Sequence, residues 1–155
     1  MNFRIVTRSS FSITGKSTLI AKADKHAQLP AFWSLCRNDG TMEALHAAGS
    51  DTVIGVGENN SHRDSFRYMI GTLAKADASH SFDKWVLPAS TWVVFDPVLS
   101  TPECVGSVWE YIFTDFLPNG DYALAPTPDL EVNQKTSHPD ADYTCEIWIP
   151  VVKKV

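Results

Sequence analysis

The sequence predicts an α+β domain in which helices pack on one face of an antiparallel sheet. Segments rich in β-branched residues alternate with segments of helical periodicity, and the order strands, helix, strands occurs twice. Such an order is typical of helices covering one face of antiparallel strands. The length suits one domain, so we expect a single domain over residues 1–155, built from two similar halves at about 1–77 and 80–155.

Six segments have the composition of strands. Residues 3–23 are rich in β-branched residues and contain Gly15, which predicts two short strands joined by a turn. Residues 85–96 contain Pro88 at a bend or an edge, so this segment is either a strand pair or one bent strand. The other strand candidates are residues 54–60, 66–74, 130–134 and 143–152.

Three segments predict helices. The first covers residues 30–40 and begins with its proline. Thr41 would cap a second, short helix that ends at Gly49. The third covers residues 101–120, and its apolar side chains follow the i, i+3, i+4 rule. These apolar residues are Val105, Val108, Trp109, Ile112, Phe113 and Phe116.

A linker and one repeated spacing support the division into halves. Residues 75–81 are small and polar, which is typical of a linker. The same spacing of 14 residues separates Leu19 from Trp33 and Phe95 from Trp109. We therefore expect a structural duplication, with a curved sheet whose other face encloses a cavity.

Charge and cysteine content exclude several classes of protein. The net charge is −5 and no run of Lys or Arg occurs, which argues against direct nucleic-acid binding. The sequence contains no run of about 18 apolar residues, so no membrane span is predicted. The three cysteines, Cys36, Cys104 and Cys145, are odd in number and widely spaced, which favours reduced thiols in a cytoplasmic protein.

No motif for catalysis or metal binding is present. The five histidines form no HxH or HxxxH pattern, and the cysteines form no CxxC pattern. The segment IGVGENN does not match GxGxxG, and no GxSxG motif occurs. We expect no metal, no cofactor and no catalytic residue.

Two acidic residues on predicted strands are the most informative polar positions. Glu131 lies between two apolar residues in LEVNQ, and Glu146 lies between two in CEIWIP. Side chains alternate between the faces of a strand. If the apolar neighbours face the helices, both carboxylates face the other side, which is either solvent or a cavity. The alternation alone favours a solvated face.

Aromatic residues favour the cavity. Trp148 shares the face of Glu146, Tyr68 occupies the corresponding place in the first half, and Trp92 lies in the middle of a strand. Exposing these rings would leave a large apolar area in water. A cavity lined by rings with a carboxylate at its base suits a flat cation. Trp33 and Trp109 lie on predicted helices, either as core residues or as further ligand contacts.

Five segments carry a resemblance to a known family: LPAFWSLCRNDG (29–40), FRYMIG (66–71), LPASTWVVF (87–95), FLPNGDYALAPTPDLEV (116–132) and CEIWIPV (145–151). In the order and spacing of these segments, the chain resembles the GyrI-like small-molecule-binding domain, also called the AraC effector-binding domain. The resemblance spans nearly the whole chain. The chain is similar to single-domain members, including some carried on mobile gene cassettes of integrons.

The resemblance implies a duplicated fold of GyrI-like or SOUL type, with a curved antiparallel sheet and a ligand cleft between the halves. The acid of the family's "pelE" segment reaches the cleft and maps to Glu131, and the acid of the final strand maps to Glu146. Aromatic residues from the strands sandwich the ligand in that family.

The expected function is binding of small hydrophobic, cationic compounds, by a monomer or homodimer that sequesters them or acts with a transcription regulator. Two alternatives stay open. The first is a hydrolase that opens strained electrophilic rings, with Glu131 or Glu146 as general acid or base. The second is an inhibitor of a partner enzyme such as a topoisomerase, for which the acidic net charge would allow mimicry of DNA.

Overall fold

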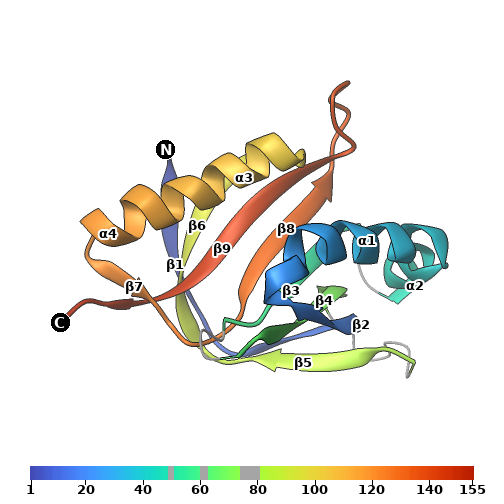
Figure 1. Ribbon diagram of the computed structural model, residues 1–155, viewed down its shortest axis with the longest axis horizontal. Helices are drawn as coiled ribbons and strands as arrows, with labels where there is room; N and C mark the ends of the chain where they lie inside the picture. The colour runs from blue at the N-terminus through green and yellow to red at the C-terminus, as the bar shows by residue number, and fades with distance from the viewer. Residues whose placement is uncertain (49–50, 60–62, 74–80) are drawn as a thin grey trace.

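The computed structural model describes residues 1–48, 51–59, 63–73 and 81–155. It confirms the predicted α+β class, with a curved nine-stranded antiparallel sheet and helices on one face (Figure 1). The strands are β1 (Phe3–Arg8), β2 (Phe11–Ala21), β3 (Val53–Gly57), β4 (Ser65–Leu73), β5 (Asp83–Leu87), β6 (Ser90–Leu99), β7 (Tyr122–Leu124), β8 (Asp129–Lys135) and β9 (Tyr143–Lys153). The helical segments are η1 (Lys22–Asp24), α1 (Lys25–Asn38), α2 (Thr41–Ala48), α3 (Pro102–Tyr111), η2 (Ile112–Phe116) and α4 (Leu117–Asn119).

The strand order has an internal symmetry. It runs β1-β6-β9-β8-β3-β4-β2-β5, with β7 paired to β9. If β1, β2, β3 and β4 are exchanged with β5, β6, β8 and β9, respectively, the order read from the other end is the same. As a result β3 and β8, one from each predicted half, lie side by side at the centre of the sheet. Most of the predicted linker, residues 75–80, lies outside the described residues.

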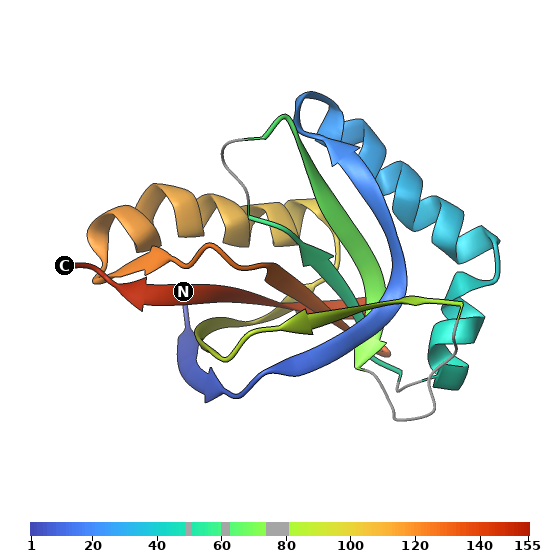
Figure 2. The same cartoon turned by 90° about the horizontal axis from the view of Figure 1, so that it is seen from below.

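A bent two-stranded ribbon joins the two ends of the sheet. β1 pairs with β6 from Phe3 opposite Phe95 to Arg8 opposite Ser90. The pairing of β2 with β5 continues that of β1 with β6 without a shift in register, starting at Phe11 opposite Leu87. Residues 85–96 therefore do not form a hairpin, because both parts pair with the N-terminal strands. Figure 2 shows this ribbon bending round from β1 to β2 beneath the helices.

The sheet is apolar on both faces because one face lies under the helices and the other lies inside the curl. Two clusters pack under the helices, one beneath α3 and one beneath α1 and α2. A third cluster contains no helical residue and fills the curl. Its buried members are Ile13, Ile54, Val56, Met69, Leu87, Trp92, Val94 and Leu130.

Two predicted helix starts are wrong. Helix α1 begins at Lys25, and Pro30 lies inside it. Residues 25–29 favour helix, and they extend α1 although Pro30 cannot donate a backbone hydrogen bond. Thr41 does not cap α2, because its N–H (3.0 Å) and its hydroxyl (2.5 Å) both donate to the carboxylate of Asp39. Gly40, between the two helices, has a φ of 88°, a value that favours glycine.

The third helix is confirmed at both ends. Thr101 caps α3 by accepting a hydrogen bond from the N–H of Cys104 at 3.2 Å. A π-helical turn, η2, continues α3, and the short α4 ends before Gly120. Within the described ranges, no helix is long and apolar enough to cross a membrane.

A close approach of two strands allows a first prediction. Gly15 lies opposite Gly71, and a Cβ added at Gly15 would lie 2.2 Å from the carbonyl oxygen of Ile70. We expect Gly15→Ala to lower the free energy of unfolding by about 2 kcal/mol, because backbone atoms cannot yield as a side chain can. Urea denaturation measures the change.

Gly106 on α3 is the matched control, since a Cβ there meets nothing within 4 Å. Gly106→Ala should raise the free energy of unfolding by about 0.5–1 kcal/mol, because alanine favours helix. Equal effects of the two substitutions would show that the strand contact does not constrain the fold.

Candidate functional site

Two carboxyl groups and two glycines face one another at the centre of the sheet, on its helix-covered side. Asp129 and Glu131 alternate along β8 and therefore point to the same face. In the pairing with β3, Asp129 lies opposite Gly57 and Glu131 opposite Gly55. Because the glycines carry no side chains, β3 can accommodate the ring of Tyr68 beside both carboxyl groups. We call these four residues, together with three aromatic residues that lie against them, the seam. Its members are Trp33, Gly55, Gly57, Tyr68, Trp109, Asp129 and Glu131.

Each long helix contributes one tryptophan to the seam. Trp33 of α1 donates its indole N–H to the hydroxyl of Tyr68 at 3.1 Å. Trp109 of α3 donates its indole N–H to Oε2 of Glu131 at 2.9 Å. The ring of Trp109 also stacks on exposed Phe113, with centroids 5.9 Å apart. The two helices thus place aromatic rings on either side of the β3–β8 pair.

Tyr68 lies along β3, over the two glycines. A Cβ at Gly57 would be 3.7 Å from Cδ1 of Tyr68, and a Cβ at Gly55 would be 2.2 Å from its hydroxyl oxygen. Gly55 is therefore required for the position of this ring. Tyr68 is buried, and burial followed by the nearby charge of Glu131 raises its pKa well above the ordinary value.

The carboxyl groups of the seam are unfavourable places for negative charge. Burial raises the pKa of Glu131, and the hydrogen bond from Trp109 opposes this shift. Burial, and then the neighbouring Glu131, raise the pKa of Asp129 to about 8, and a hydrogen bond from Asn59 opposes the shift. Both side chains are only partly exposed to solvent. Their surroundings have a low dielectric constant, which disfavours the charged forms although neither group is completely enclosed.

Neither carboxyl group has a basic partner among the residues that the structure describes. Among the described residues, the ion pairs are Arg4 with Glu146, Lys16 with Asp39, His46 with Asp51 and Arg67 with Glu58. None of these pairs involves the seam. A positively charged group placed there would stabilise the ionised carboxylates, and no described side chain supplies one.

The prediction that Glu131 and Glu146 face the same side of the sheet is wrong. Glu131 lies opposite Ile147, whereas Glu146 lies opposite Val132, and directly paired residues share a face. Glu131 thus faces the helices, and Glu146 faces the inside of the curl with Trp148. Tyr68 lies on the helix side, so it does not share the face of Trp148 as predicted.

Glu146 is already neutralised by the chain itself. Arg4 forms an ion pair with its Oε2 at 3.0 Å, and the indole N–H of Trp148 donates to its Oε1 at 2.8 Å. Trp148 packs edge-on against Trp92, with centroids 5.8 Å apart. Trp92 is 1% exposed and belongs to the cluster inside the curl. Of the predicted site residues, the structure thus brings together Trp33, Tyr68, Trp109 and Glu131, and it places Trp92, Glu146 and Trp148 on the other face.

Asp129 and the two glycines were missed by sequence reasoning, although a signal exists. Asp129 and Glu131 alternate, so they must share a face whatever that face contacts. Gly55 and Gly57 also alternate, which predicts a strip without side chains on one face of their strand. A mismatch to GxGxxG argues only against phosphate binding, and it does not test whether the strip accommodates a side chain of a neighbouring strand.

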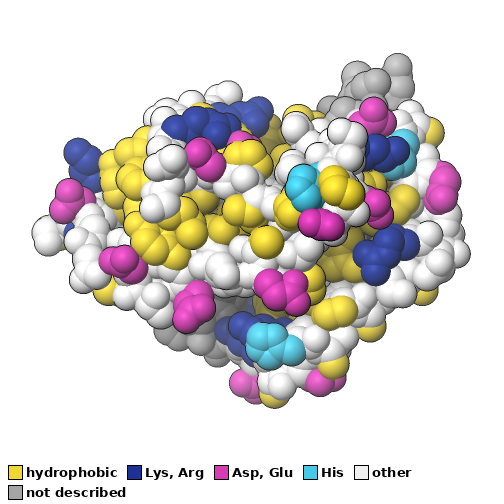
Figure 3. All heavy atoms as spheres, turned by 90° about the horizontal axis from the view of Figure 1, so that it is seen from above, with side chains coloured by type: hydrophobic (Ala, Val, Ile, Leu, Met, Phe, Trp, Pro, Cys, Tyr) yellow, Lys and Arg dark blue, Asp and Glu magenta, His cyan; other side chains and the backbone are white. Residues whose placement is uncertain are grey.

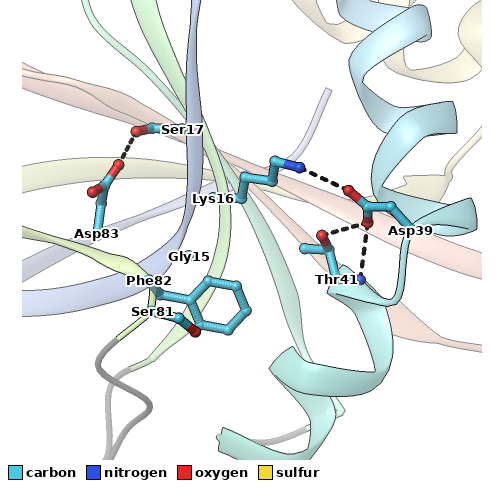
Figure 4. A pocket seen from close by; sticks show the side chains of 8 residues that line it. All are labelled: Gly15, Lys16, Ser17, Asp39, Thr41, Ser81, Phe82 and Asp83. Atoms are coloured by element: carbon cyan, nitrogen blue, oxygen red, sulfur yellow. Dashed lines mark hydrogen bonds and ion pairs between the residues drawn. The ribbon is translucent and has the colours of Figure 1, made fainter.

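The described hollows on the surface lie away from the seam. One of about 320 Å³ lies where β2 and β5 approach α2. Its polar groups are paired with one another, Lys16 with Asp39 at 2.7 Å and Ser17 with Asp83 (Figure 4). Another of about 480 Å³ includes Arg8 and lies near the bend of the ribbon. Within the part of the chain that is described, no cluster of acidic, histidine and cysteine side chains could hold a metal ion.

Solved structures of three proteins share this fold. SAV2435, bound to tetraphenylphosphonium, is 19% identical with a TM-score of 0.84, covering 98% of this chain and 94% of that chain. A putative transcription regulation protein from Staphylococcus aureus is 20% identical with a TM-score of 0.79, covering 97% and 98%. The integron cassette protein VCH_CASS2 from Vibrio cholerae is 18% identical with a TM-score of 0.65, covering 97% and 95%. The class of fold is therefore that of GyrI-like effector-binding domains, and the resemblance seen in the sequence is confirmed.

The chain belongs to the Cass2 family of integron-associated effector-binding proteins, whose sequence profile matches residues 4–151. No curated protein matches the chain.

The raised pKa of Asp129 gives a second prediction. In the folded protein this carboxyl group keeps its proton up to about pH 8, whereas in the unfolded chain it ionises above pH 3.8. The folded state therefore binds more protons between these values, so stability falls as pH rises through this window. We expect a loss of at least about 1 kcal/mol, or about 3 °C in Tm, between its ends.

Asp129→Asn should remove that part of the pH dependence, because the amide does not titrate. Asp142→Asn, at an exposed position, is the control that should keep it. Thermal unfolding of the three proteins over a pH series makes the comparison. A stability difference between Asp129→Asn and the wild type that does not change with pH would contradict the raised pKa.

Proposed function

We propose that this protein binds small hydrophobic organic cations at the seam. The observation that carries the proposal is a pair of poorly solvated carboxyl groups, without a basic partner among the described residues, flanked by tryptophans from both long helices. In this proposal Glu131 is the charge partner of the ligand, and Trp33, Tyr68 and Trp109 are its aromatic contacts.

The chemistry of the seam favours large, weakly hydrated cations. An aromatic face attracts a cation through its quadrupole, and the attraction grows when water is excluded. The Coulomb energy between a carboxylate and a cation is also larger where the effective dielectric constant is low. A lipophilic cation gives up little hydration on entering such a place, so it gains more than a small, strongly hydrated ion.

Two comparisons support this ligand class. The family is described as effector-binding, and SAV2435, which shares the fold, has tetraphenylphosphonium bound. Hydrophobic side chains also gather on the surface of the α3–α4 half when the helix-covered face is viewed (Figure 3), and exposed Phe113 of η2 stacks on Trp109. We infer that hydrophobic parts of a ligand would extend toward this half.

Three residues predicted for the site take a different role in this proposal. Trp92 and Trp148 fill the inside of the curl, and Glu146 is paired with Arg4 there. We assign them to the support of the sheet, away from the ligand. The Glu146 position thereby becomes a control for tests of Glu131.

Two outputs of ligand binding are consistent with this proposal. Capture alone would sequester a toxic cation. The similarity to a putative transcription regulation protein also favours a regulator as partner, which would detect the liganded state. Both outputs need the same binding step.

Glu131→Gln should weaken the binding of tetraphenylphosphonium about tenfold, equivalent to about 1.4 kcal/mol, because the amide keeps the shape and loses the charge. The binding of triphenylphosphine oxide, a neutral analogue, should change by less than about twofold. Isothermal titration calorimetry measures both affinities. At a ligand concentration one hundred times the Kd, the wild type should gain about 2.7 kcal/mol of stability, which thermal shift detects.

Glu146→Gln is the matched control, since it makes the same chemical change on the opposite face. It should leave the affinity for tetraphenylphosphonium unchanged. If Glu131→Gln weakened the binding of the cation and of the neutral analogue equally, the result would contradict an electrostatic role of this residue. A larger effect of Glu146→Gln would place the site inside the curl.

A further inference from the structure

We propose that Asp129 forms a second cation subsite in the seam, so that the protein selects ligands carrying two cationic groups, one at each carboxyl group of β8. This inference rests on the proposed function and adds to it the class of ligand. It is carried by the positions of Asp129, Glu131 and the two glycines opposite them.

The two carboxyl groups are arranged as equivalent places along one line. Alternate residues of a strand are about 7 Å apart, and both side chains point to the helix side. Each faces a glycine of β3, and a Cβ at Gly57 would lie only 3.4 Å from Oδ1 of Asp129. The carboxyl group of Asp129 therefore lies close over Gly57, next to the ring of Tyr68, which fills the space over Gly55.

One aromatic ring borders both places. Tyr68 has Cδ1 toward Gly57 and its hydroxyl toward Gly55, so the ring runs along the line that joins the two carboxyl groups. A flat spacer between two cationic groups would lie along the same line. Trp109 borders only the place of Glu131, through its hydrogen bond.

The balance of charge also favours a dication. A single bound cation would leave one of two neighbouring carboxyl groups either protonated or ionised without a partner. Asp129 has only the amide of Asn59 as a described hydrogen-bonding neighbour, and Asn59 is itself fixed by donating to the carbonyl of Thr127 at 2.7 Å. Asn59 can donate a hydrogen bond but carries no charge, so the second positive group must come from the ligand.

The test compares two permanently charged probes of the same shape. The dication is 1,4-bis(trimethylammoniomethyl)benzene, and the monocation is 4-(2,2-dimethylpropyl)benzyltrimethylammonium, in which one cationic nitrogen is replaced by carbon. Neither probe titrates, so changes in affinity report on the protein alone. Calorimetry on the wild type should give an affinity for the dication at least about tenfold higher than for the monocation, as for a close charge pair.

Asp129→Asn should reduce this ratio to about one, and Asp142→Asn, which changes the net charge equally at an exposed position, should keep it. If Asp129→Asn does not fold, the 1,2-isomer of the dication decides on the wild type. Its two charges lie too close together to reach both carboxyl groups, so it should bind about as weakly as the monocation.

The outcomes separate this inference from the proposed function. Equal affinities of the wild type for the dication and the monocation, with tetraphenylphosphonium bound normally, would overturn the second subsite and leave the function standing. The same holds for a ratio that survives in Asp129→Asn, or for equal binding of the two isomers. Failure of all the cations to bind would overturn both proposals.

Discussion

The structure depends on a strip at the centre of the sheet where two carboxyl groups face two glycines and have no basic partner in the described part of the chain. Asp129 and Glu131 are held on the helix side by the alternation of β8, and the absence of side chains at Gly55 and Gly57 lets the ring of Tyr68 lie beside them. Desolvation makes the charged forms unfavourable and raises both pKa values. In a sheet built only for stability, such positions would carry apolar side chains, so the strip stores an unfavourable interaction that a cation can relieve.

The rest of the fold positions this strip. Each predicted half supplies one central strand and one long helix, and the helices pack over separate clusters on either side of the β3–β8 pair. Trp33 and Trp109 reach inward from these helices and end in hydrogen bonds to Tyr68 and Glu131. On the other face, the bent ribbon encloses an apolar cluster that packs against the central strands. This cluster is formed by strand residues and contains no side chain from the helices.

The sequence predicted the fold class and most elements because strand composition, helical periodicity and the Thr101 cap are local signals. It did not predict which way Glu131 points, because both faces of this sheet are apolar. On β9 the aliphatic residues beside Glu146 face the helices, whereas on β8 those beside Glu131 face the inside of the curl. The faces become fixed only when the register pairs Glu131 with Ile147, and register is a long-range property that no single segment encodes.

The central claim is that a bound cation holds the seam carboxyl groups in their ionised form, and proton release measures this directly. Tetraphenylphosphonium is titrated into the protein by calorimetry near neutral pH, in buffers with different enthalpies of ionisation. Burial raises the pKa values of both Glu131 and Asp129 in the free protein, and a cation bound beside them lowers both values, so binding should release a fraction of a proton. The release should be lost in the Asp129→Asn, Glu131→Gln double variant. Binding that leaves proton occupancy unchanged, or takes protons up, would contradict the account.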